Sequence, residues 1–172
     1  MQISDTLLQA IAENKEALKE NRLDDFFMNM LDKISTAQFT GEAYRLMLNS
    51  GIDPLDYMSF IPPYAYWKSQ ISNLEIPPTI KTICSCAFMN CIGQDEIILP
   101  EGLISIYSFA FVHSSFDKIY LPESLMSIDN EAFIEYDDKF SIPPTLVVKK
   151  NGKTSSYLHD YGFDRLCLIE EV

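Results

Sequence analysis

Positive charge is scarce in this sequence. The chain carries 13 lysine and arginine residues against 25 aspartate and glutamate residues, which gives a formal net charge of −12. Nucleic acids and anionic lipid surfaces are bound through basic side chains, so neither is expected as a direct partner. The composition instead allows a protein partner with a basic surface.

Catalytic and metal-binding signals are missing as well. The only two histidines are His113 and His159, and neither lies in a recognised catalytic motif. The chain has no phosphate-binding loop, no dinucleotide glycine pattern and no His-Glu-x-x-His motif. Cys84, Cys86 and Cys91 lie too close together, without a histidine nearby in sequence, for a typical structural zinc site. We therefore expect no enzyme activity, no cofactor and no metal.

The first twenty residues lack the long apolar run of a signal peptide or a membrane-spanning helix. They include Asp5, Glu13, Lys15 and Glu16, and charges at that spacing interrupt any apolar segment. As written, the sequence predicts a cytoplasmic protein with no membrane contact. In that compartment the four cysteines are expected to stay reduced.

What the sequence does contain is a repeat. The motif Leu-x-Ile-Pro at Pro77 recurs at Pro100, Pro122 and, in a degenerate form, Pro143. These prolines are separated by 23, 22 and 21 residues, a period typical of leucine-rich repeats. The first three prolines are each followed by the same apolar frame: Ile80, Ile83, Ala87 and Phe88, then Leu103, Ile106, Ala110 and Phe111, then Leu125, Ile128, Ala132 and Phe133.

Each repeat predicts one coil of a solenoid. In Leu-x-Ile-Pro, alternate apolar side chains point inward along a short strand, and proline ends the strand because it has no N–H to donate. A second extended piece follows, from Ile80 to Ile83 in the first unit, and then a turn of helix around Ala-Phe. One coil cannot bury its own apolar side, so coils must stack and the ends of the stack must be covered.

The first unit reads Ile-Pro-x-x-Ile-x-x-Ile-x-x-x-Ala-Phe-x-x-Cys and ends at Cys91, which resembles the BspA-like leucine-rich repeat. In the later units Ser114 and Tyr136 stand at the cysteine position. The resemblance implies a right-handed solenoid with narrow parallel sheets, a buried Cys91, and a binding role without catalysis. Helices followed by a short array also resemble uncharacterised bacteriophage proteins, which implies a host protein as the partner.

The flanking sequences complete the expected fold. Amphipathic patterns over 4–20, 23–34 and 41–50, and a helical turn capped by Asp53, predict an all-helical N-terminal cap. The fold class is thus an α/β solenoid, a short leucine-rich repeat array of about three to four coils with parallel strands behind that cap. The expected regions are the cap at 1–70, the repeats at 71–148, and a C-terminal cap at 149–172 with a short helix at 155–161 and a last strand at 166–169.

Strand alternation predicts which residues face a partner. Ile98 and Tyr120 are expected to face outward from the first ladder, and Ile104 and Met126 from the second. Apolar side chains that gather on a small protein's surface often mark an interaction site. The alternative is that the N-terminal helices cover them. With charged and aromatic neighbours added, the candidate partner-binding residues are Ile98, Tyr120, Ile104, Met126, Glu75, Glu96, Lys118 and Trp67.

Trp67 has two interpretations, because the segment Tyr64–Trp67 either shields the open end of the solenoid or presents an anchor to a partner. Two functions also stay open. The first is a non-enzymatic protein interaction module, as a phage- or bacterium-encoded inhibitor or adaptor, with self-association as a further option. The second is an acidic decoy that mimics nucleic acid on a basic site, and its binding would fall steeply with salt.

Overall fold

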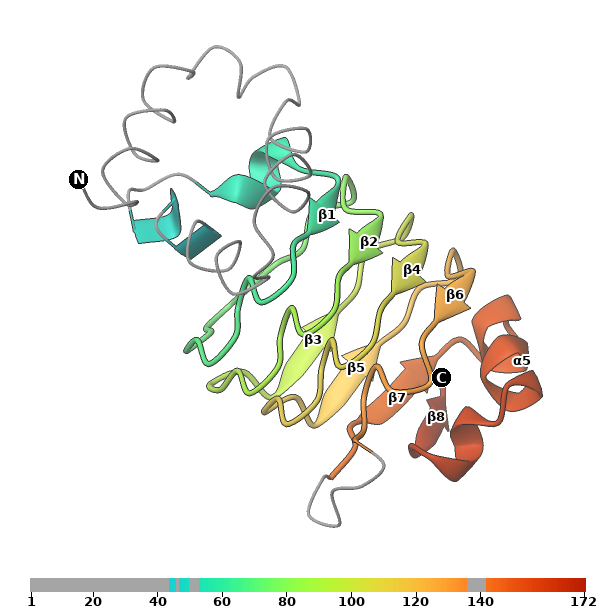
Figure 1. Cartoon of the computed structure of the whole chain (residues 1–172). Helices are drawn as coiled ribbons and strands as arrows, with labels where there is room; N and C mark the ends of the chain where they lie inside the picture. Colours follow the sequence, from blue (N-terminus) through green and yellow to red (C-terminus); the bar gives the residue numbers. More distant parts are fainter. Residues whose placement is uncertain (1–43, 46, 50–52, 136–141) are drawn as a thin grey trace.

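The computed structural model describes residues 44, 45, 47–49, 53–135 and 142–172. Its core consists of two four-stranded parallel sheets that run side by side along the chain (Figure 1). One sheet has the order β1 Phe60–Ile61, β2 Thr82–Ile83, β4 Ser105–Ile106, β6 Ser127–Ile128; the other has β3 Glu96–Ile98, β5 Lys118–Tyr120, β7 Thr145–Val148, β8 Ile169–Glu171. The predicted parallel-strand solenoid is therefore confirmed.

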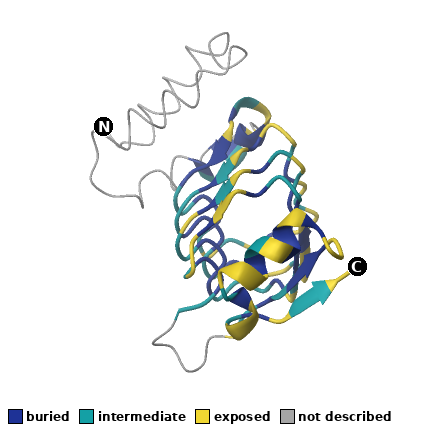
Figure 2. Cartoon of the chain, turned by 90° about the vertical axis from the view of Figure 1, so that its right-hand side faces the viewer, coloured by how far each residue is buried: buried dark blue, intermediate teal, exposed yellow. Residues whose placement is uncertain are grey.

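The register of the ladders follows from the repeat. Ile97 pairs with Ile119, and Ile119 pairs with Leu146. All three side chains are buried, so each coil places one apolar residue at the same depth of the core. Since one coil contributes a single short strand to each ladder, a strand has no partner within its own coil. Figure 2 shows the buried residues lining the inside of the stacked coils.

A column of aromatic rings runs through the coils. The rings of Tyr66, Phe88, Phe111 and Phe133 stack with centroid distances of 4.9, 5.1 and 5.6 Å. Backbone bonds accompany the stack, because the N–H groups of Tyr66, Phe88 and Phe111 each donate to the alanine carbonyl of the next coil, as in Phe88 N to Ala110 O at 2.8 Å. The predicted role of Ala-Phe in joining neighbouring coils is confirmed.

The segment around Ala-Phe is a chain of tight turns, not the expected turn of helix. Cys86 and Asn90 have left-handed backbones, with φ of 60° and 57°. A left-handed residue interrupts a right-handed helix, so the turn closes through short bonds such as Ala87 N to Cys84 O at 3.2 Å. The neighbouring coils repeat this geometry at Tyr64 and Lys68 and at Phe109 and His113.

The parallel ladder begins about one coil before residue 71. Phe60 pairs with Thr82, and the Tyr66 ring stacks on Phe88. Tyr64–Trp67 is therefore the Ala-Phe turn of an additional coil, which the expected start of the array had missed. Of the expected N-terminal helices, residues 44, 45 and 47–49 are helical, and the short helix η1 Pro54–Tyr57 begins at its predicted cap, Asp53. The rest lie outside the described residues.

Two of the expected Leu-x-Ile-Pro strands are wrong. Residues 74–77 form no strand, although Leu74 N donates to Gln94 Oε1 at 2.9 Å. In the fourth unit, Ile142 is 89% exposed and the ladder partner of Ile119 is Leu146. The repeat had aligned Phe140 with Ile119, so the motif misplaced the strand by six residues, because a second apolar run, Thr145–Val148, follows shortly after it.

The C-terminal cap has the predicted order of elements. Helix α5 spans Lys153–Asp160, the 3-10 helix η2 spans Phe163–Arg165, and β8 begins at Ile169, slightly later than expected. Gly162 lies between the helices with a φ of +78°, which glycine adopts without a steric penalty. The Phe163 ring meets Phe133 edge-on at 6.5 Å. The cap therefore continues the aromatic column while ending the coils.

Candidate interaction surface

The outer face of β3 and β5 carries the first predicted pair, Ile98 and Tyr120. They are register partners on adjacent strands. Ile98 is 72% exposed, and Tyr120 is half-buried. The Tyr120 hydroxyl donates to Glu96 Oε2 at 3.1 Å, and this bond raises the pKa of Tyr120. Tyr120 thus lies beside Ile98, and its hydroxyl is fixed by the hydrogen bond to Glu96.

Lys118 and Glu170 make an ion pair across the same sheet. Their atoms Nζ and Oε2 are 2.7 Å apart. The side chains come from β5 and β8, and β7 lies between these strands. Val147 of β7 is only 2% exposed although its register partner on the outer face is Tyr120. The pair therefore spans the outer face of β7, and the bond to Glu170 raises the pKa of Lys118.

The second predicted pair, Ile104 and Met126, lies immediately before β4 and β6. Met126 N donates to Ile104 O at 2.9 Å, and Ile104 N donates to Lys81 O at 2.8 Å. The two side chains are therefore neighbours on adjacent coils. Ile104 is 40% exposed and Met126 is 66% exposed. As predicted, this column presents apolar side chains outward.

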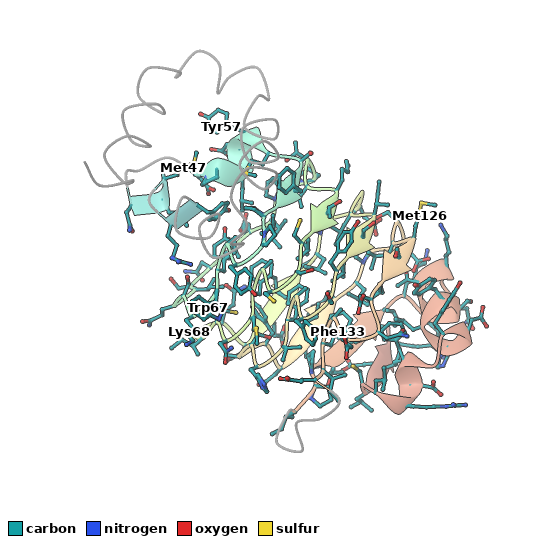
Figure 3. The ribbon with its side chains drawn as sticks, in the orientation of Figure 1. Met47, Tyr57, Trp67, Lys68, Met126 and Phe133 are labelled. Atoms are coloured by element: carbon teal, nitrogen blue, oxygen red, sulfur yellow. The ribbon has the colours of Figure 1, made fainter. Side chains whose placement is uncertain are left out.

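The structure separates the eight candidates into three groups. The turn at residues 101–102 lies between Ile98 and Ile104, so the two apolar pairs belong to different sheets. Trp67 and Met126 lie on opposite sides of the array (Figure 3). Trp67 and Glu75 instead line a cleft of about 890 Å³ at the first coil, together with Arg45 and Asp53.

Trp67 is fixed by its neighbours in the chain. Its ring meets Tyr64 edge-on at 5.8 Å, and Lys68 Nζ lies 4.5 Å from the ring centroid. The tryptophan is half-buried. Sequence reasoning missed Tyr107, which follows β4 and is 52% exposed. Its only signal was its position one residue beyond the inward-facing Ile106, where alternation turns the side chain out.

Three of the four cysteines, Cys86, Cys91 and Cys167, are buried, and Cys84 is half-buried. All four are free. Burial raises the pKa of Cys91 to about 12 and that of Cys167 to about 12, so the reactive thiolate is suppressed at neutral pH. His113 lies 3.4 Å from Glu135, Nε2 to Oε2. Within the described part of the chain, no group of three or more His, Cys, Asp or Glu side chains is arranged to hold a metal.

A helix of sufficient length and apolarity to cross a membrane is not found among the described residues.

Comparison with known proteins gives one match. No curated protein and no solved structure matches the chain. The BspA type leucine rich repeat region matches residues 59–152 in six copies, which is more than half of the chain. Its first matched residue directly precedes β1, where the parallel ladder begins. The chain therefore belongs to the BspA type leucine-rich repeat family.

Proposed function

We propose that this chain is a non-enzymatic protein interaction module that binds its partner through exposed apolar side chains on the outer faces of the solenoid. The observation that carries the proposal is the pair Ile98 and Tyr120 on adjacent strands, with Ile98 72% exposed. Ile104 and Met126 form a second such pair. The candidate role is that of an inhibitor or adaptor.

These positions do not need apolar residues for folding. Along each strand the inward residues, such as Ile97 and Ile119, supply the core. An outward isoleucine adds nothing to that core, and polar side chains are accepted at such positions, as Glu96 shows. Burying an isoleucine or methionine side chain against a partner contributes roughly 1.5–3 kcal/mol. Two apolar pairs therefore offer enough for a specific contact when the partner's shape matches.

Charge sets the chemistry of the rim. Glu96 borders Tyr120, and Glu75 lies exposed one coil earlier. Lys118 is already paired with Glu170. A partner with basic residues around an apolar centre suits this surface, because opposite charges at a rim speed association and exclude wrong partners. The decoy alternative has the net charge alone in its support.

The test is affinity capture of the tagged protein from lysate of the cells that express it, at low and at high salt. Wild type is compared with the double variant Ile98→Asp, Tyr120→Ala, and with Ile142→Asp, which changes another isoleucine that is 89% exposed. We expect a stoichiometric partner that survives high salt with wild type and Ile142→Asp but is lost with the double variant.

Other results have defined meanings. A nucleic-acid-binding partner that leaves all three proteins in high salt would favour the decoy. A partner that the folded double variant retains would refute the role of Ile98 and Tyr120. Sedimentation of the purified chain then tests self-association, which the double variant should abolish if the same pair mediates it.

A further inference from the structure

β8 is the last strand of its sheet, and its far edge has no strand beside it in the described structure. Leu168 O accepts from Leu146 N at 2.8 Å, and Val172 N donates to Val148 O at 2.9 Å. These residues alternate along β8, so the strand directs the backbone groups of Leu168, Glu170 and Val172 toward β7. In a parallel ladder the intervening residues direct theirs the other way. Ile169 and Glu171 therefore present N–H and C=O groups at the free edge.

The corresponding edge of the other sheet is covered. There β6 is the last strand, and the Tyr157 hydroxyl of α5 accepts from Ile128 N at 3.1 Å. The C-terminal cap thus closes one sheet with a helix and extends the other by a strand. Figure 2 shows β8 at the margin of the molecule, beside the C-terminus. Open edge strands are templates for pairing with another chain.

We infer that the free edge of β8 binds an extended, basic segment of a partner protein as an additional strand, through the backbone groups of Ile169 and Glu171. Strand addition of this kind takes affinity from main-chain hydrogen bonds and specificity from alternate side chains. The site is separate from the two apolar pairs and goes beyond the proposed function, because it recognises a peptide backbone.

The side chains of β8 define what the segment carries. Leu168 and Val172 are 69% and 68% exposed. Glu170 lies on the same face of the strand and is paired with Lys118, whereas the carboxylate of Glu171 lies on the opposite face, where only the neutral Ser155 hydroxyl bonds to it. Opposite charges on facing strands stabilise a pair, whereas like charges destabilise it. A second copy of β8 paired antiparallel with Glu170 opposite Glu170, or with Glu171 opposite Glu171, would set like charges against each other. A segment that alternates lysine or arginine with aliphatic residues fits instead.

The test uses the full chain and a fluorescein-labelled ten-residue peptide that alternates lysine with valine. Binding is followed by fluorescence anisotropy, and the amides of β8 are followed by NMR hydrogen exchange. In the free protein, the amides of Ile169 and Glu171 should exchange fast and that of Val172 slowly. The peptide should bind and slow the exchange of Ile169 and Glu171. A peptide that alternates glutamate with valine should bind at least about tenfold more weakly.

Two variants of Glu171 distinguish the contribution of its backbone N–H to peptide binding from that of its carboxylate. Glu171→Pro and Glu171→Ala both lose the carboxylate and its contact with Ser155, but only proline also removes the free-edge N–H. Proline is accepted on an edge strand when its missing N–H faces solvent. We expect Glu171→Pro to bind the peptide at least about tenfold more weakly than Glu171→Ala.

The peptide provides a control that leaves the protein unchanged. Methylation of alternate peptide nitrogens removes the donors on one edge of the peptide while its charge is kept. The two methylated forms should differ by about tenfold or more, because only one edge faces β8. Equal binding by both forms, unchanged exchange of Ile169 and Glu171, or no binding up to about 1 mM would each overturn the inference.

Discussion

At the scale of single residues, Gly152 and Glu123 connect helix α5 of the C-terminal cap to the preceding coils. Gly152 precedes α5 and has no side chain to cap it. Glu123 reaches over from the adjacent coil, and its Oε2 accepts from Lys153 N at 2.7 Å. A carboxylate at a helix N-terminus also interacts favourably with the helix dipole. The N-terminus of α5 is thus capped by the side chain of Glu123, which lies 30 residues earlier in the chain than Lys153.

We predict that Gly152→Ala destabilises the cap, because the added methyl would lie 2.7 Å from Glu123 Oε2. The Glu123 carboxylate must then move away and lose its bond to Lys153 N, so the expected cost is about 0.5–2 kcal/mol, as for a lost helix N-cap. Urea unfolding measures it, and the double variant with Glu123→Ala should show a smaller additional cost, because the obstacle is gone. Gly162→Ala is the matched control, since nothing lies near that position and its cost comes from its φ of +78° alone. Equal costs of Gly152→Ala with and without Glu123 would contradict the contact.

The buried thiols predict a loss of stability at alkaline pH. The pKa of Cys91 rises from 9.0 to about 12 on folding, and that of Cys167 does the same. Between these values the unfolded chain loses thiol protons that the folded chain keeps. The free energy of unfolding should therefore fall by about 1.4 kcal/mol per pH unit for each thiol. It should not change on this account below pH 9.

Urea unfolding under reducing conditions, from neutral pH into this window, measures the slope. The Cys91→Ala variant starts less stable because of the cavity it creates, yet its stability should fall less steeply with pH. Tyr44 and Tyr66, whose pKa values burial also raises, steepen the fall in both proteins equally. A slope that the variant leaves unchanged would show that Cys91 ionises as readily folded as unfolded.

At the scale of elements, the ion pair over β7 fastens the last strand to the array. We predict that Glu170→Gln loosens β8, because Lys118 then loses the carboxylate that it reaches across β7. Both groups are partly exposed, so the cost should be small and shrink with added salt. Amide exchange of Val172 should speed up while that of Ile119 does not change. Glu96→Gln removes the carboxylate that Tyr120 binds but keeps the Lys118–Glu170 pair, and it should leave Val172 exchange at its wild-type rate.

The elements also show which parts of the fold the sequence could predict. Before Pro100 and Pro122, the strands β3 and β5 lie where they were expected. The literal Leu-x-Ile-Pro at 74–77 forms no strand, although its sequence fits the motif best. The extended pieces that became β2, β4 and β6 were expected too. The first coil was missed because tyrosine replaces phenylalanine at Tyr66 and two prolines precede it. Whether a segment joins the array depends on its stacking against the neighbouring coil, and the sequence of a single repeat does not contain that contact.

The candidate surface was predictable residue by residue but not as a whole. Exposure of Ile98, Ile104 and Met126 follows from strand alternation and the repeat. Their division between two sheets depends on the turn that each coil makes between its strands. The Lys118–Glu170 pair joins residues 52 positions apart, and no pattern within one repeat indicates it. Contacts that cross from the array to its cap lie beyond the reach of periodicity.

At the scale of the whole molecule, the aromatic column joins each coil to the next. In a solenoid each coil touches only its neighbours, so stability is close to a sum of coil and interface terms. Phe111 lies in the middle, stacked between Phe88 at 5.1 Å and Phe133 at 5.6 Å. Phe163 ends the column and touches Phe133 alone among the stacked rings. A loss at the middle therefore weakens two interfaces, and a loss at the end weakens one.

We predict that Phe111→Ala costs about 3–5 kcal/mol, the range for an emptied aromatic core site. It should speed amide exchange on both sides, at Ile83 and at Leu146 alike, because neither half of the array is stable alone. Phe163→Ala empties an equally buried site, but its effect on exchange should be confined to β7, β8 and α5. Hydrogen exchange of the two variants at matched temperature makes the comparison. If Phe111→Ala accelerated exchange on one side only, the coils would be independent units, and the aromatic column would not couple the two ends of the molecule.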